Sequence, residues 1–193
     1  MNFDKKYWEE RYLSHQTGWD TGSVTTPLKT YFDQLENKNL KILIPGAGNG
    51  HEVAYLWSQG FKHVYLLDIT EAATRGFKQA HPDFPAEYVL NEDFWNHQEE
   101  YDLIVEQTFF CALDPALRKK YVTKMHELLK PGAKLVGLLW SVDINKDHPP
   151  FGGHTEEYLE LFKDPFKIEV MENAYNSIAP RAGRELFIKM IKV

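Results

Sequence analysis

The stretch KILIPGAGNGHEVAYLWSQG, residues 41–60, decides the fold of this chain of 193 residues. Residues 41–45 predict a strand, and residues 51–59 have the apolar spacing of a helix that ends at Gly60. A glycine-rich turn, residues 46–50, joins the two elements. Because strand, tight turn and helix form the opening of a βαβ unit, the stretch predicts an α/β fold with a parallel sheet.

The remaining sequence continues to alternate short strand-like runs with longer helical patterns, and it contains no internal repeat. Strands are expected at residues 63–69, 86–90, 101–105, 133–140, 166–172 and 185–193, and the last two are expected to pair as a hairpin-like edge. Helices are expected at residues 70–80 and 114–129 and from Thr155 onward, with Thr70 and Thr155 as caps. Residues 3–15 and 26–36 predict two amphipathic helices that form an N-terminal cover.

Length and composition predict one globular domain with an interior large enough for a core. The formal charge of −6 comes from 22 basic and 28 acidic residues that are interleaved, so no nucleic-acid partner is expected. No apolar run approaches the roughly 20 residues of a membrane span, which predicts no membrane contact and a cytoplasmic location. Cys111 is the only cysteine, which excludes an intrachain disulfide and metal sites of several thiolates; no metal is predicted.

The glycine turn is the first candidate for ligand binding. Glycines there let a ligand approach the backbone, and the following helix presents its free amides. The spacing is GxGxG from Gly46 through Gly48 to Gly50, and His51 stands where the dinucleotide fingerprint needs its last glycine. This departure argues against a nicotinamide or flavin cofactor. A tight strand-to-helix turn without a ligand remains the alternative.

Two further acidic positions indicate an adenosine-containing ligand. Asp68 ends the second strand, where a carboxylate can accept both ribose hydroxyls, and capping by Thr70 would leave it free to do so. Asp93 and Phe94 follow the third strand and offer a carboxylate for the adenine amine and a ring for its face. The alternative for this pair is a turn residue beside a core side chain.

These residues resemble the thiopurine methyltransferase superfamily, and most of all its halide/thiol branch, which includes plant halide and thiocyanate methyltransferases. The matching segments span nearly the whole chain in the family's order: TGWDTG (17–22), LIPGAGNG (43–50), LLDIT (66–70), EDF (92–94), TFFCALDPALR (108–118), ELLKPGAKL (127–135), HPPF (148–151) and PRAGRE (180–185). The Trp-Asp loop, the FFCA run and the PRAGRE ending are far more specific than the glycine turn.

The resemblance implies a Rossmann-like class I S-adenosylmethionine-dependent methyltransferase fold. Such a fold is a seven-stranded, mostly parallel sheet with helices on both faces; here residues 1–37 would form a helical cover and residues 38–193 the core of one methyltransferase domain. S-adenosylmethionine would lie over the C-terminal ends of the first, second and fourth strands. Positions that match cofactor contacts in the family are Trp8, Trp19, Gly46, Gly48, Asp68, Ile69, Asp93 and Phe94.

Two departures concern the methionine part of this cofactor. Gln107 stands where the thiopurine enzymes have an arginine, and Ile44 occupies a position that is acidic in many methyltransferases. Another group must therefore meet the methionine part. Glu106, the Gln107 side chain and backbone carbonyls are the candidates, and the sequence does not rank them.

The expected reaction needs positioning more than acid–base chemistry. Methyl transfer from a sulfonium is an in-line displacement, and a thiolate or halide needs little or no general base. An aromatic enclosure lowers the barrier because water stabilises the separated charges more than the transition state. The expected walls are Trp19, Phe109, Phe110, Trp140 and Phe151, of which Trp19, Phe109 and Phe110 position the reactants, although each is equally well explained as core.

Several side chains near these segments could have either a chemical role or a purely structural one. Cys111 has apolar neighbours and is expected to be a buried structural thiol and not a nucleophile. His148 and His154 flank the HPPF segment and are either proton acceptors for a thiol or surface loop residues. Arg181 is proposed to contact the acceptor; it and Arg184 either attract an anion or form structural ion pairs.

Three functions of different kinds follow. The favoured one is an S-adenosylmethionine-dependent methyltransferase that acts on a small thiol, thiocyanate or halide, with a thiopurine or aromatic thiol as the alternative acceptor. The second is a nucleotide-dependent oxidoreductase, which a cofactor titration would separate from the first. The third is a non-catalytic S-adenosylmethionine-binding module, which would release no S-adenosylhomocysteine. Oligomeric state stays open, although a monomer is plausible.

Overall fold

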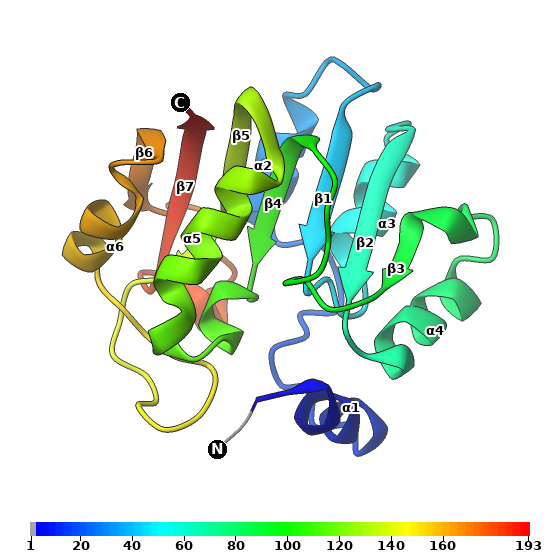
Figure 1. Ribbon diagram of the computed structural model, residues 1–193. Coiled ribbons are helices and arrows are strands. Elements are labelled where there is room, and N and C mark those ends of the chain that lie inside the picture. The colour runs from blue at the N-terminus through cyan, green and yellow to red at the C-terminus, as the bar shows by residue number, and fades with distance from the viewer. Residues whose placement is uncertain (1–2) are drawn as a thin grey trace.

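A computed structural model describes residues 3–193 and, within them, a seven-stranded sheet (Figure 1). The strands are β1 Lys41–Pro45, β2 His63–Asp68, β3 Val89–Asn91, β4 Tyr101–Gln107, β5 Leu129–Trp140, β6 Phe166–Asn173 and β7 Glu185–Lys192. Their order is β3-β2-β1-β4-β5-β7-β6; β1 to β5 pair in parallel, and β7 is antiparallel to both β5 and β6. The predicted α/β class and the antiparallel edge are confirmed.

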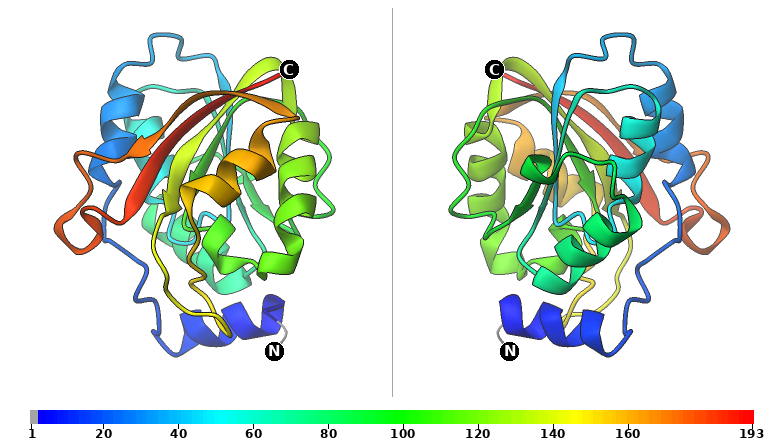
Figure 2. Two further views of the ribbon diagram at one scale, coloured as in Figure 1. Left: turned by 90° about the vertical axis from the view of Figure 1, so that its left-hand side faces the viewer. Right: turned by 90° about the vertical axis from the view of Figure 1, so that its right-hand side faces the viewer.

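Helices cover both faces of the sheet, and each face has its own apolar core (Figure 2). On one face lie α2 Thr26–Asp33, α3 His51–Ser58 and α4 Glu71–Ala80; on the other lie α5 Arg118–Glu127 and α6 Thr155–Phe162. Alternate strand residues serve the two cores: Ile42 and Ile44 face α2 and α3, and Leu43 between them faces the α5 side. This alternation explains why the central strand β1 is apolar on both faces.

The two N-terminal helices have different positions. Helix α1, Lys5–Leu13, lies beyond the carboxyl ends of β1 to β4, at the bottom of Figure 1, and none of its residues is buried. Helix α2 buries Pro27, Leu28 and Phe32 against the sheet. Helix α2 is amphipathic as predicted, but it belongs to the core and not to a cover, whereas the predicted apolar face is wrong for α1. No helix in the described part of the chain is long and apolar enough to cross a membrane.

Three predicted boundaries are also wrong. The predicted strand at 86–90 begins as the 3-10 helix η1 Ala86–Tyr88, and only Val89–Asn91 pair with β2. The helix predicted to reach 129 ends at Glu127, since Leu129 already pairs with Tyr101 across an irregularity in the β4–β5 register. His154, not Thr155, is the N-cap of α6.

Candidate active site

The glycine turn after β1 needs its glycines for backbone and contact reasons. Gly46, Gly48 and Gly50 have φ values of 59°, 55° and 71°, in the left-handed region that side chains disfavour. A Cβ atom on Gly46 would lie 2.3 Å from the Phe109 ring, and one on Gly48 would lie 2.5 Å from the Tyr12 hydroxyl oxygen. The turn is thus a bare backbone surface that aromatic side chains approach closely.

Asp68, at the end of β2, organises this turn. Its Oδ2 accepts the Gly48 amide at 2.9 Å, and its Oδ1 accepts the amide and the hydroxyl of Thr70 at 2.8 and 2.7 Å. Burial raises the pKa of Asp68 above its ordinary value, although these bonds favour the charged form. The expectation that Thr70 caps α4 with its side chain is wrong, because its hydroxyl donates to Asp68 instead. Since a carboxylate offers about four acceptor sites, Asp68 keeps capacity for a ribose hydroxyl.

The residues expected at the adenine show the structural roles that the sequence had left open. Asp93 Oδ1 accepts the Trp95 amide at 2.9 Å and so holds the turn after β3. Phe94 is 3% exposed, and its ring meets that of Phe109 edge-on at 5.0 Å. Phe94 therefore supports the ring that lies against Gly46. Ile69 is half-buried and directly follows Asp68.

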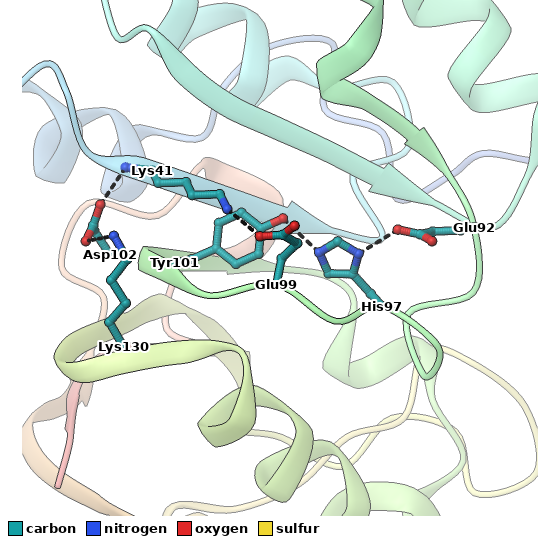
Figure 3. A network of polar contacts seen from close by, with 7 residues as sticks. All are labelled: Lys41, Glu92, His97, Glu99, Tyr101, Asp102 and Lys130. Carbon is teal, nitrogen blue, oxygen red and sulfur yellow. Dashed lines mark hydrogen bonds and ion pairs between the residues drawn. The ribbon is translucent and has the colours of Figure 1, made fainter.

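The loop of Asp93 and Phe94 is anchored by a buried histidine. His97 Nδ1 lies 2.5 Å from Glu92 Oε1, and its Nε2 lies 2.7 Å from the Tyr101 hydroxyl. The His97 carbonyl accepts from Lys124 at 2.6 Å. The polar contacts continue along the sheet to four more charged residues (Figure 3): Lys41, Glu99, Asp102 and Lys130. The His97 contacts hold the loop of Asp93 and Phe94 to β4 and α5, next to the proposed adenine position.

Glu106 is held by partners within its own chain. Its Oε1 accepts the amides of Phe109 and Phe110, both at 2.8 Å, and its Oε2 accepts the Tyr121 hydroxyl. The side chain is fully buried and passes beside Gly137 of β5, where any Cβ atom would lie 2.4 Å from that of Glu106. The Glu106 carboxylate therefore shapes the loop after β4, and a contact with the cofactor stays a prediction.

The protonation of Glu106 makes a testable contribution to stability. Burial raises its pKa to about 7 from an ordinary value of 4.5, despite the hydrogen bonds from Tyr121, Phe110 and Phe109. Between these values the folded chain holds a proton that the unfolded chain has released, so the free energy of unfolding falls as pH rises. Glu106→Gln is expected to reduce this fall by about 2 kcal/mol between pH 5 and 7. Urea unfolding at pH 5 and at pH 7 measures the free energy of unfolding of both proteins. An equal decrease in the wild type and in Glu106→Gln would contradict the prediction.

Gln107, the last residue of β4, has a side-chain oxygen without a hydrogen-bond donor among the described residues. The residue is 9% exposed, and its Oε1 is buried without a hydrogen-bond partner among residues 3–193. A buried acceptor of this kind calls for a donor. The ammonium group of a methionine moiety is such a donor. Together with the bare turn and Asp68, this oxygen makes the site fit S-adenosylmethionine.

Aromatic rings of the N-terminal segment surround Trp19. The Trp8 and Tyr12 rings of α1 meet Trp19 edge-on, at 5.5 and 5.8 Å between centroids. Phe3 in turn meets Phe151 of the loop after β5 at 5.6 Å. The structure thus brings Trp8, Trp19 and Phe151 to the carboxyl edge of the sheet. Tyr12 was not among the predicted site residues, although its place four residues after Trp8 puts it on the same helix face.

Asp20 fastens the Trp19 loop to the glycine turn. Its carboxylate accepts the Gly22 amide at 2.8 Å and Asn49 Nδ2, and its Oδ1 lies 2.6 Å from His51 Nε2. Burial works against ionisation of Asp20, but these hydrogen bonds outweigh it and lower the pKa below its ordinary value. The same His51 that breaks the dinucleotide fingerprint therefore binds the cover loop. Asp20, His51 and Asn49 were not among the predicted site residues.

Arg181 supplies positive charge on the other side of Trp19. It belongs to the 3-10 helix η4 Ala179–Arg181 and is 5% exposed. Its Nη2 donates to the Trp19 carbonyl at 2.8 Å, and its Nη1 lies 3.3 Å from Glu185 Oε1. The Trp140 ring is within 5.6 Å of the Arg181 guanidinium and within 5.1 Å of that of Arg184. Arg181 thus forms a structural ion pair with Glu185 and also contacts the Trp19 carbonyl and the Trp140 ring.

Three other predicted groups take structural or surface positions. Phe110 is 2% exposed and packs against Tyr121 and Tyr158, as the core alternative expected, and its part in an acceptor wall stays a prediction. Cys111 is buried, and burial with the nearby Glu106 charge raises its pKa to about 12, so the predicted inert thiol is confirmed. His148 and His154 are exposed in the loop after β5.

Comparison with known proteins decides the family. A sequence model of thiopurine S-methyltransferase matches residues 3–189. The chain belongs to the thiopurine S-methyltransferase family. It is 34% identical to a probable thiol methyltransferase 2 of Arabidopsis thaliana and 33% identical to thiocyanate methyltransferase 1 of Brassica oleracea, in each case over 92% of this chain and 81% of the relative. Thiopurine S-methyltransferase of Vibrio parahaemolyticus is 25% identical over 82% of each chain.

Solved structures agree on the fold. The 1,6-didemethyltoxoflavin-N1-methyltransferase of Burkholderia thailandensis, crystallised with S-adenosylhomocysteine, superposes with a TM-score of 0.77 at 16% identity over 98% of this chain and 87% of its own. Magnesium protoporphyrin IX methyltransferase of Synechocystis, with bound S-adenosylmethionine, gives 0.75 at 14% identity over 98% and 95%. The Rossmann-like class I fold is thereby confirmed. This family member is an S-adenosylmethionine-dependent methyltransferase, and neither the oxidoreductase nor the non-catalytic alternative is favoured.

Proposed function

We propose that this thiopurine S-methyltransferase family member methylates a small anionic acceptor: a thiolate, thiocyanate or a halide. The observation that carries the proposal is the buried Arg181 guanidinium, which donates to the Trp19 carbonyl and lies 5.6 Å from the centroid of the Trp140 ring. A guanidinium attracts an anion, and aromatic rings exclude the water that would stabilise it. The names of the thiol and thiocyanate methyltransferases at 33–34% identity support the same class of acceptor.

The chain's residues are assigned to positioning. Gly46, Gly48 and Asp68 would hold the adenosine half of S-adenosylmethionine, and Gln107 Oε1 would accept from its ammonium group. When bound, this cofactor supplies an electrophilic methyl group on a sulfonium. Trp19 and Trp140 would then exclude water from the line between acceptor and methyl group. An acceptor that is already anionic suits this site, because Cys111 stays protonated and the Glu106 carboxylate is already hydrogen-bonded.

A product assay tests the acceptor class. S-adenosylhomocysteine formation is measured with bisulfide, thiocyanate, iodide, thiophenol and a thiopurine as acceptors. Turnover is expected with the first three. Activity confined to thiophenol and thiopurine would move the acceptor to aromatic thiols, and activity only on an oxygen or nitrogen nucleophile would refute the proposal.

Trp19→Ala separates its role in the site from a role in folding. The substitution removes the ring that Trp8 and Tyr12 contact, and kcat with thiocyanate is expected to fall about 100-fold, as for loss of a well-placed positioning group. The circular dichroism spectrum should not change, because Trp19 is only half-buried. Tyr175→Ala, at a residue 88% exposed, is the control. Undiminished turnover of Trp19→Ala would remove Trp19 from the site.

A further inference from the structure

Helix α1 lacks the packing that normally fixes a helix to a domain. None of its residues is buried, although the Trp8 and Tyr12 rings contact Trp19. Most helices in proteins are held by an apolar face. The position of α1 over the carboxyl edge of the sheet must therefore depend on a few specific contacts.

Glu9 makes the most specific of these contacts. Its Oε2 accepts the Glu71 amide at 2.8 Å, and its Oε1 accepts the Ala72 amide at 2.9 Å. These are first-turn amides of α4, which no residue of their own helix can satisfy. Thr70, the N-cap of α4, makes no side-chain cap because its hydroxyl donates to Asp68. Glu9 therefore caps α4 from another helix.

The cap connects α1 to the cofactor-binding segments. Helix α4 starts three residues after Asp68, and burial together with the nearby charge of Glu9 raises the pKa of that aspartate. One turn along α1 from Glu9, the Tyr12 hydroxyl lies against Gly48. Residues of one helix face thus touch the glycine turn and the start of α4, three residues after Asp68.

We propose that Glu9 is a positioning residue that holds α1 closed over bound cofactor by capping α4, so that breaking this cap accompanies cofactor release. The inference rests on the proposed cofactor position. Loss of a helix cap corresponds to a factor of roughly 2 to 30 in an equilibrium constant. The cap should therefore slow dissociation measurably without being needed for folding.

The test compares Glu9→Ala and Glu9→Gln with a matched control. Glu10→Gln changes the neighbouring glutamate, whose side chain is 66% exposed and 3.9 Å from Lys6. Dissociation of S-adenosylhomocysteine is followed by stopped-flow tryptophan fluorescence, and hydrogen exchange is measured at the Glu71 and Ala72 amides. A third readout is KM for S-adenosylmethionine against kcat.

Glu9→Ala is expected to release S-adenosylhomocysteine about tenfold faster, to exchange both amides faster and to raise KM without lowering kcat. Glu9→Gln should lie between Glu9→Ala and the wild type, because its amide retains one acceptor, and Glu10→Gln should match the wild type. If Glu9→Ala keeps the wild-type rates of release and exchange, the inference about Glu9 is overturned and the proposed cofactor site is not affected. A wild-type chain that binds no S-adenosylhomocysteine would refute the proposed cofactor site as well, whatever the exchange rates.

Discussion

Asp68→Ala is expected to weaken binding of S-adenosylhomocysteine at least about 100-fold. Two effects add: the ribose loses a hydrogen bond to a charged acceptor, worth about 1.5–3 kcal/mol, and the Gly48 amide loses the oxygen that holds the glycine turn. Isothermal titration calorimetry measures the change. Asp68→Asn should be intermediate, because it keeps one carbonyl oxygen but places an amino group opposite N–H donors.

The control for Asp68 is an aspartate of the same kind without contacts to the site. Asp83→Ala changes an exposed residue in the loop after α4 and should bind like the wild type. Thermal unfolding of all variants shows whether the turn itself has collapsed. If folded Asp68→Ala binds S-adenosylhomocysteine within threefold of the wild type, the cofactor does not lie on this carboxylate.

Arg181→Met should impair both stability and turnover, for separable reasons. It leaves Glu185, 3% exposed, without its cation, and breaking a buried pair in this way costs about 3–5 kcal/mol. It also removes the proposed anchor of the acceptor, so kcat/KM for thiocyanate is expected to fall about 100-fold. Urea unfolding and the product assay give the two values.

A second variant separates these effects. Arg181→Met combined with Glu185→Gln removes both charges, and the amide introduced by the second substitution can still pair with the Ser177 hydroxyl, which donates to Glu185 at 2.8 Å. Stability should largely return because no uncompensated charge remains, whereas turnover of thiocyanate should stay low. Recovery of turnover along with stability would show that Arg181 is structural only.

Most of the fold follows from local patterns, and the errors fall where a distant partner decides. The strand at residues 41–45 and the helix from His51 were predicted with nearly the observed bounds, because an apolar run and a glycine turn are local signals. The burial of α2 could not be predicted in this way. Its apolar side chains are compatible with a cover or a core, and only the sheet opposite Leu28 and Phe32 decides between them.

In the site, too, the residue type could be predicted from the sequence, but the partner of each residue could not. Asp68 and the glycines were predicted because strand ends and glycine spacing carry chemistry of their own. The partners of Glu106 could not be predicted, because an acidic residue at a strand end looks the same whether it faces a ligand or, as here, the amides of Phe109 and Phe110. Glu9 and Asp20 were missed because their partners are 62 and 31 positions away in the sequence.

The place of β7 between β5 and β6 has a consequence for synthesis on the ribosome. Six strands leave the exit tunnel before β7 does, yet β6 reaches the sheet only through its pairing with β7. Until Glu185–Lys192 emerges, the hydrogen-bonding edge of β5 is open and Arg181 lacks Glu185. The proposed acceptor side of the site is therefore completed only after β7 has emerged, whereas a nascent chain that has exposed only β1 to β4 already contains the glycine turn and Asp68.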